Sequence, residues 1–294
     1  MTLGKACWMK FKFRYVDDYF PIERNKNLTL GRVVHEAFEL HYRGADKDSI
    51  ISHISRRYKE EMAKCEMTDQ EALIIDRATA LGMWMNNPFI RERYDSVEVE
   101  EEKDIPFIGR TRLIYKMDAK VKLNNHCWLI ERKVTSQDKR KFDNFCRTSS
   151  QVTNYIFAER LTGQSVDGVI FECIRRPLLR KGVTETADEF ARRITRDYNV
   201  RPDFYYDRKI AYRSQDELDL FAEDTKKLIS EMRRRIRKNE FYRNTDHCWA
   251  FNSECPYMKI CFSKIPDPLL LELYYVKGGG HNDNRIEERQ SGQS

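Results

Sequence analysis

Two residues of opposite charge, Glu131 and Lys133, stand in the apolar run WLIERKVT, residues 128–135. The run is typical of a buried β-strand, where an unpaired charge is costly. Side chains alternate across a strand, so both project from the same face, with their Cα atoms about 6.5 Å apart. They form either a salt bridge at the end of a strand or part of a site that binds a metal ion and its water.

A second acid, Asp118, lies in the preceding run IYKMDAKVKL, residues 114–123. If a short turn at residues 124–125 pairs the two runs as neighbouring strands, Asp118 lies beside Glu131. Two carboxylates supply hard oxygen ligands that hold Mg²⁺ or Mn²⁺ and leave positions for water and phosphate. Such an ion lowers the pKa of its water, and Lys133 would orient or deprotonate that water. The three residues therefore predict hydrolysis of a phosphodiester bond.

The E-x-K spacing is a weak signal by itself in a chain with this many charges. It recurs at Glu101 and Lys103, with Asp95 upstream. That second run carries charges on both faces and no partner strand precedes it, so we interpret it as solvated. An isolated E-x-K is more often structural, so the metal-site interpretation of Glu131 and Lys133 depends on the rest of the sequence.

The composition limits the classes of function. The 294 residues include 53 lysines and arginines against 47 acids, giving a net charge of +6 and a pI of about 8.8. This mildly basic balance permits a nucleic-acid partner without requiring one. No stretch approaches the roughly 20 apolar residues of a membrane span and no secretory signal is recognisable, so we expect a cytoplasmic protein without a membrane partner. In that compartment the eight cysteines favour metal or cluster ligation over disulfides.

Apolar periodicity predicts the elements that must position these residues. Helices are expected at 28–42, within the polar segment 46–93, and at 149–163, 186–198 and 215–239. Strands are expected at 96–101, 108–123, 126–134, 165–176 and 203–213, with turns at 104–106 and 124–125. This order predicts an α/β fold in which helices flank a mixed β-sheet core. The early strands should pair antiparallel, and the later ones, reached across helices, parallel.

The same patterns predict how the chain is divided. We expect a single domain over residues 1–276, with a helical insertion at 46–95 and a cysteine-containing C-terminal clamp at 240–265. Residues 277–294 have almost no apolar content, which predicts a disordered tail.

Four motifs in this order, GRVVHE, YKMDAKV, LIERKV and QVTNY, resemble the PD-(D/E)XK nuclease superfamily. The resemblance is to its RecB-like exonuclease branch, which includes phage-type nucleases and the nucleases of CRISPR adaptation. It extends from about residue 5 to residue 263, and IRRPLLRKG and CPYMKIC are also similar to the phage-type members. The resemblance implies a restriction-endonuclease-like mixed sheet, in agreement with the predicted order of elements.

The resemblance also implies roles for single residues. Asp118 and Glu131 would be metal-binding carboxylates and Lys133 the catalytic lysine. His35, in the helix of GRVVHE, would be an additional metal ligand, and the backbone carbonyl of Arg132 would also face the ion. The sequence departs from the family pattern at Lys116, where glycine is frequent, and in the bulk of Arg132, yet neither departure removes a catalytic group.

Gln151 and Tyr155 form the Q-x-x-x-Y motif, which the resemblance associates with DNA binding and active-site geometry. They are four residues apart and so share one face of a helix. The alternative for this pair is packing, with the tyrosine hydroxyl reaching a surface partner. The alternative for His35 is a partly buried helix histidine.

The C-terminal region contains Cys248, Cys255 and Cys261 in the pattern C-x6-C-x5-C, and Cys7 lies near the other end. The four resemble the ligands of the iron–sulfur cluster in this nuclease branch, although related proteins usually have C-x2-C before the last cysteine. Four thiolates suit a [4Fe–4S] cluster or structural zinc. The alternative is buried or free thiols, which is also our interpretation of the remaining cysteines: Cys65, Cys127, Cys146 and Cys173.

Three basic stretches, at 138–147, 174–181 and 232–238, could contact phosphates. The first lies between the E-x-K and Q-x-x-x-Y motifs, where a substrate must pass. The preferred nucleic-acid-binding residues are therefore Lys139, Arg140, Lys141 and Arg147, together with Gln151 and Tyr155.

The leading hypothesis is a Mg²⁺- or Mn²⁺-dependent DNA nuclease, expected to act as an exonuclease or flap-type enzyme on single strands or duplex ends. One alternative is a catalytically silent subunit with the same fold that grips DNA or a helicase or recombination partner. A binding-only protein need not keep Asp118, Glu131 and Lys133 together, which favours the enzyme. A third possibility is an RNA substrate on the same fold.

Overall fold

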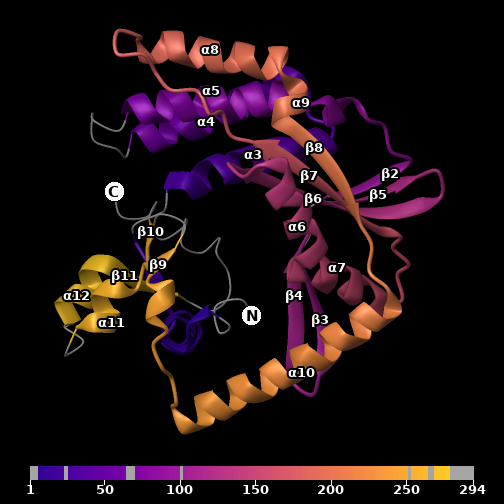
Figure 1. Cartoon of the computed structure of the whole chain (residues 1–294), viewed down its shortest axis with the longest axis vertical. Coiled ribbons are helices and arrows are strands. Elements are labelled where there is room, and N and C mark those ends of the chain that lie inside the picture. The colour runs from indigo at the N-terminus through magenta and orange to yellow at the C-terminus, as the bar shows by residue number, and fades with distance from the viewer. Residues whose placement is uncertain are drawn as a thin grey trace. The chain divides into compact units, whose positions relative to one another are not determined.

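The computed structural model describes residues 6–22, 26–63, 70–99, 102–250, 253–263 and 268–278 (Figure 1). The chain divides into two compact units, each described here by itself. The core unit comprises residues 26–223, and the terminal unit comprises residues 1–25 and 224–294. The single domain expected over residues 1–276 thus corresponds to the core unit together with most of the terminal unit. No helix in the described part of the chain is long and apolar enough to cross a membrane.

A five-stranded mixed sheet forms the centre of the core unit (Figure 1). Its strands, in spatial order, are β2 (Ser96–Val99), β5 (Ala119–Leu123), β6 (His126–Thr135), β7 (Gly168–Arg175) and β8 (Tyr206–Ala211). Strands β6 and β7 are parallel, and the other neighbours are antiparallel. The predicted mixed sheet flanked by helices is confirmed.

Strand β8 corrects the expectation that strands reached across helices would be parallel. Tyr206, at the start of β8, pairs with Ile174, near the end of β7. The chain therefore re-enters the sheet at the end where it left, because α8 (Ala187–Val200) returns it after the loop at 176–186.

The run expected as one strand over 108–123 is broken at Met117 and Asp118. Its first half is β4 (Thr111–Lys116), which pairs with β3 (Glu102–Ile108) in a separate two-stranded sheet. The turn expected at 104–106 was wrong, since those residues lie in β3 and the chain reverses at Gly109 and Arg110 instead. Gly109 has a φ of +56°, which favours glycine, and Pro106 is tolerated because β3 is an edge strand with a bulge.

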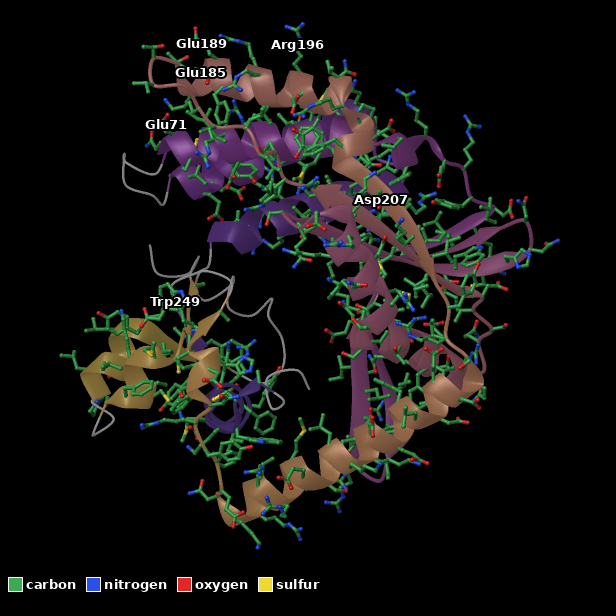
Figure 2. All side chains as sticks on the ribbon, in the orientation of Figure 1. Glu71, Glu185, Glu189, Arg196, Asp207 and Trp249 are labelled. Atoms are coloured by element: carbon green, nitrogen blue, oxygen red, sulfur yellow. The ribbon has the colours of Figure 1, made fainter. Side chains whose placement is uncertain are left out.

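Helices cover both faces of the five-stranded sheet. On one face lies α3 (Lys26–Tyr42), whose residues Leu30, Val34 and Phe38 pack into a buried cluster with the helices beyond it. These helices are α4 (Lys47–Met62), α5 (Gln70–Met85) and α8. The first two lie within residues 46–95, the segment expected as a helical insertion. Glu189 and Arg196 project from the outer side of α8 (Figure 2).

On the other face lie α6 (Lys139–Thr148) and α7 (Ser150–Leu161), which pack on β6 and β7 through a second buried cluster. Both begin with a side-chain cap, Asp138 for α6 and Ser149 for α7, each accepting a hydrogen bond from a backbone N–H in the first turn. The chain leaves α7 through Gly163, whose φ of +77° completes the predicted C-terminal cap.

The terminal unit joins the two ends of the chain. Strand β1 (Tyr19–Pro21) pairs antiparallel with β11 (Tyr275–Lys277). Lys277, expected as the first residue of the tail, thus pairs with Tyr19, and residues 279–294 lie outside the described residues. The remaining elements are α2 (Trp8–Phe11), η1 (Lys12–Val16), η4 (Thr245–His247), β9 (Trp249–Ala250), β10 (Ser253–Glu254), α11 (Met258–Phe262) and α12 (Pro268–Tyr274). The long helix α10 (Gln215–Lys238) begins in the core unit and ends in the terminal unit.

Candidate active site

Asp118 occupies the break between β4 and β5, immediately before the ladder in which Ala119 pairs with Ile130. Its position in the register places it beside Glu131, as the strand pairing predicts. One carboxylate oxygen accepts the backbone N–H of Arg132 at 2.5 Å, and the other lies 2.8 Å from Nδ1 of His35. Asp118 is therefore held between a strand of the sheet and helix α3.

Glu131 and Lys133 project from the same face of β6, and Lys133 Nζ lies 2.6 Å from Glu131 Oε1. Glu131 is only 3% exposed, whereas the Lys133 side chain is 33% exposed. The salt bridge considered as an alternative is present, and it points one end of the pair toward solvent. It does not exclude a metal site, because the second carboxylate, Asp118, lies beside it.

The charges of the site influence each other. Burial disfavours ionisation of Asp118, but the charge of His35 and its hydrogen bond hold the Asp118 pKa below its usual value. Burial and the charge of Asp118 raise the pKa of Glu131, and Lys133 opposes this only in part. Burial lowers the affinity of His35 for a proton, yet contact with Asp118 raises its pKa overall. The buried carboxylate of Glu131 and the partly buried carboxylate of Asp118 therefore repel each other, and a bound cation would relieve this repulsion.

Gln151 and Tyr155 lie in successive turns of α7 and bond to each other, with Gln151 Nε2 2.6 Å from the tyrosine oxygen. The Tyr155 hydroxyl donates to the carbonyl of Lys116 at 2.5 Å. Burial, followed by the charge of Glu131, raises the Tyr155 pKa. The pair thus fixes the end of β4, two residues before Asp118. Tyr155 packs in a buried cluster and its hydroxyl reaches the backbone of exposed Lys116, as the packing alternative expects, and the role of the pair in DNA binding stays a prediction.

Helix α6 follows directly after β6 and presents a basic face. The four predicted phosphate-binding residues are exposed and form no ion pairs with described residues: Lys139, Arg140, Lys141 and Arg147. The opposite face is anchored by buried Phe142, and half-exposed Phe145 packs edge-on against Phe171 of β7. The basic residues are therefore displayed on a rigid helix.

The residues of this site fit a hard divalent cation by their chemistry. Asp118 and Glu131 supply oxygen donors. His35 Nδ1 already contacts Asp118, so the imidazole would have to turn from this contact before it could bind the same ion as Asp118. Within the described residues, no three His, Cys, Asp or Glu side chains are already gathered as a metal site. Side chains around Asp118 would therefore have to move to enclose an ion.

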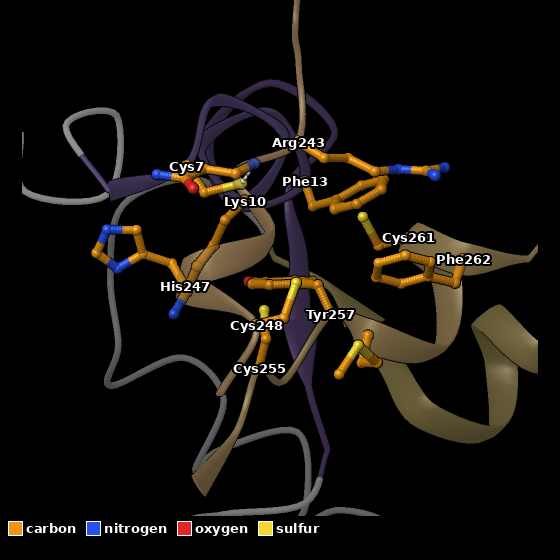
Figure 3. A pocket seen from close by; sticks show the side chains of 12 residues that line it. Cys7, Lys10, Phe13, Arg243, His247, Cys248, Cys255, Tyr257, Cys261 and Phe262 are labelled. Atoms are coloured by element: carbon orange, nitrogen blue, oxygen red, sulfur yellow. Dashed lines mark hydrogen bonds between the residues drawn. The ribbon is translucent and has the colours of Figure 1, made fainter. Parts of the chain in front are cut away.

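The four predicted cluster cysteines line one pocket of the terminal unit (Figure 3). Cys7 immediately precedes α2, Cys248 and Cys255 lie between η4 and α11, and Cys261 lies within α11. Burial raises the pKa of the Cys255 and Cys261 thiols, and the backbone N–H of Asn244 donates to Cys7 Sγ at 3.4 Å. The described cysteines outside the pocket lie in or beside the core of the other unit, and Cys65 lies outside the described residues.

Sequence reasoning missed Glu172, which is completely buried in β7. Its Oε2 lies 2.7 Å from Arg132 Nε, and its Oε1 accepts from Arg208 at 2.6 Å. The signal was available, because a single acid interrupts the apolar run GVIFECI at 168–174 as Glu131 interrupts its own strand. Lys103 was interpreted as solvated, but it bonds to buried Glu159 at 2.8 Å.

A family model described as the PD-(D/E)XK nuclease superfamily matches residues 2–262. The match covers most of the 294 residues, and the chain belongs to this superfamily. Its mixed five-stranded sheet with flanking helices agrees with the restriction-endonuclease-like fold, and proteins of the superfamily are generally nucleases. No curated protein and no solved structure matches the chain significantly.

Proposed function

We propose that the chain is a metal-dependent DNA nuclease of the RecB-like branch that acts as an exonuclease on single strands or duplex ends. The observation that supports this most strongly is that Asp118, just before β5, lies beside Glu131 and Lys133 of β6 in a member of this superfamily. His35 approaches the same point from α3.

In this proposal Asp118, Glu131 and His35 hold Mg²⁺ or Mn²⁺, with the carbonyl of Arg132 as a further donor. The bound ion supplies a water of lowered pKa and neutralises charge on the phosphate. Lys133, the most exposed group of the site, orients that water or donates to the phosphate oxygen that gains negative charge. Tyr155 and Gln151 keep the end of β4 in place, and the basic face of α6 binds the phosphates of the strand.

End-labelled single- and double-stranded DNA, incubated with Mn²⁺, Mg²⁺ or EDTA, tests this function. We expect metal-dependent release of terminal nucleotides, and a fall of about 10²–10⁴-fold in rate for Lys133→Ala. Lys122→Ala is the matched control, because it removes an exposed lysine of β5 outside the site and should retain activity.

Three outcomes would contradict the proposal in different ways. Binding without cleavage under every condition would support the silent DNA-binding subunit. Internal cuts without terminal products would replace the exonuclease with an endonuclease. Cleavage of labelled RNA in preference to DNA would change the substrate class.

We also propose that Cys7, Cys248, Cys255 and Cys261 hold a [4Fe–4S] cluster, since all four line one pocket. Protein purified without oxygen should then be brown, absorb light at about 400 nm and contain iron. Zinc without iron would indicate a structural zinc site instead. Colourless protein with neither metal would contradict any four-cysteine site.

A further inference from the structure

Arg132 lies between the two functional residues of β6, but its side chain points to the opposite face of the sheet. The guanidinium is 1% exposed and lies between two rings of α3, 4.2 Å from the centre of Phe38 and 4.7 Å from that of Tyr42. It donates to the Tyr42 hydroxyl, and its Nε is 2.7 Å from Glu172 Oε2, at an angle outside that of a hydrogen bond. The side chain thus joins α3 to β6 and β7.

The backbone of the same residue holds Asp118, because the Arg132 N–H donates to Asp118 Oδ2. The other oxygen of Asp118 contacts His35, which lies one turn before Phe38 on α3. Arg132 therefore acts on the His35–Asp118 pair from both sides. Its backbone N–H holds Asp118, and its side chain holds helix α3, which carries His35. A shift of α3 along the sheet would separate His35 from Asp118.

We propose that Arg132 is a positioning residue that sets the register of α3 on β6, and thereby the geometry of the His35–Asp118 pair. The inference rests on the proposed metal site for its catalytic consequence. A guanidinium is required because it lies over both rings while it also reaches the Tyr42 hydroxyl and Glu172, whereas the compact ammonium of lysine offers a single point of contact.

The charged contacts of Arg132 extend away from the site through Glu172. The second oxygen of Glu172 binds Arg208 of β8, which in turn makes two bonds to Glu92, at 2.6 and 2.9 Å. Glu92 follows the short helix η3 (Pro88–Arg91) at the end of the helical insertion. The insertion is therefore connected to the candidate site by a chain of four alternating charges.

The test must distinguish two roles of the Arg132–Glu172 pair: stabilising the fold alone, or positioning α3 on β6. Replacing such a pair by apolar residues of similar volume is often neutral for stability. The double variant Arg132→Met/Glu172→Leu should therefore melt close to the wild type while α3 loses its register. Lys120→Met is the matched control, because it breaks the buried ion pair with Glu159 without touching α3.

Two measurements on the full chain test the proposal. Direct Mn²⁺ binding, followed by electron paramagnetic resonance, should weaken about 10- to 100-fold in the double variant, as for other partners that orient metal ligands. Hydrogen exchange should show lost protection in residues 35–42. The Lys120→Met control should lower the melting temperature and leave Mn²⁺ binding unchanged.

Wild-type Mn²⁺ affinity and wild-type protection of α3 in the double variant would overturn the proposal. If the wild type itself neither binds Mn²⁺ nor cleaves DNA, the proposed function fails. The positioning role is then decided by hydrogen exchange alone, through the loss or retention of protection at residues 35–42 in the double variant. If the double variant does not fold, Arg132→Lys replaces it, since it keeps the charge. Arg132→Lys that matched the wild type in both measurements would also overturn the proposal.

Discussion

Glu159 of α7 is the centre of a second buried charge network, separate from the candidate site. Its carboxylate accepts hydrogen bonds from Lys103 and Lys120, both at 2.8 Å, and from Tyr115 at 2.7 Å. The network ties the two-stranded sheet of β3 and β4 to α7. Burial by itself would raise the pKa of Glu159, but these donors hold it below its ordinary value of 4.5.

This depressed pKa predicts how stability depends on pH. A group whose pKa is lower in the folded than in the unfolded state stabilises the fold above the unfolded pKa, and the contribution is lost as pH falls through the folded pKa. Glu159→Gln should therefore cost about 3–5 kcal/mol at pH 7, because it leaves Lys103 and Lys120 without a carboxylate partner. The difference from the wild type should shrink below pH 4.5.

Urea denaturation of both proteins between pH 7 and pH 3 measures this difference. Glu223→Gln, an exposed change on α10, is the control and should follow the wild type throughout. A deficit for Glu159→Gln that stays constant across the whole pH range would contradict the predicted linkage.

At the site, the sequence was sufficient to predict contacts between residues that are close along the chain. Alternation put Glu131 and Lys133 on one face, and the turn at Asn124 and Asn125, both with positive φ, set the register that brings Asp118 beside Glu131. The contact of His35 with Asp118 spans 83 residues, so no spacing could predict it. The roles of all these residues in catalysis stay predictions.

At the scale of elements, α6 is the part of the core unit best suited to bind a nucleic-acid backbone. Arg140 and Arg147 lie two turns apart on its exposed side, and the helix begins four residues after β6 ends. Each phosphate contact contributes a slope of about 0.7–0.9 to the fall of binding with salt, on logarithmic axes.

We expect Arg140→Gln/Arg147→Gln to reduce this salt slope by about 0.7–0.9 for each lost contact. Fluorescence anisotropy with labelled DNA at several salt concentrations measures it. Arg192→Gln/Arg196→Gln on the outer side of α8 removes the same charge and should leave the slope unchanged. An equal effect of both double variants would mean that net charge, rather than this helix, determines binding.

The elements themselves were predictable where a single period persists. The helices α3, α7, α8 and α10 lie close to the ranges that their apolar spacing predicted. Strands β6 and β7 also lie within or close to their predicted ranges. The break at Met117 and Asp118 was not predictable, because apolar residues alternate through it without interruption while β4 and β5 belong to different sheets. Nor was the direction of β8, since it depends on where α8 returns the chain.

At the scale of the whole molecule, the sequence ends meet in one unit. Cys7 lies in the N-terminal part of that unit and shares its pocket with cysteines from the C-terminal part. The two parts are also joined by the three-residue pairing of β1 with β11, by backbone hydrogen bonds such as that from the Met9 N–H to the Tyr242 carbonyl, and by a small cluster around Tyr257. A metal group bound by all four thiolates would link Cys7 to the three C-terminal cysteines. The free energy of metal binding would then contribute to the folding of this unit.

Loss of the proposed cluster should therefore unfold the terminal unit and spare the core unit. Cys255→Ser, purified without oxygen, should lack iron and show a separate, lower thermal transition. Hydrogen exchange should lose protection at residues 242–263 and keep it in β6. Cys127→Ser is the matched control, because it makes the same change in β6 outside the pocket and should retain the wild-type iron content. Iron bound equally by both variants, or a single transition shifted for the whole chain, would show that these thiols do not hold the terminal unit together.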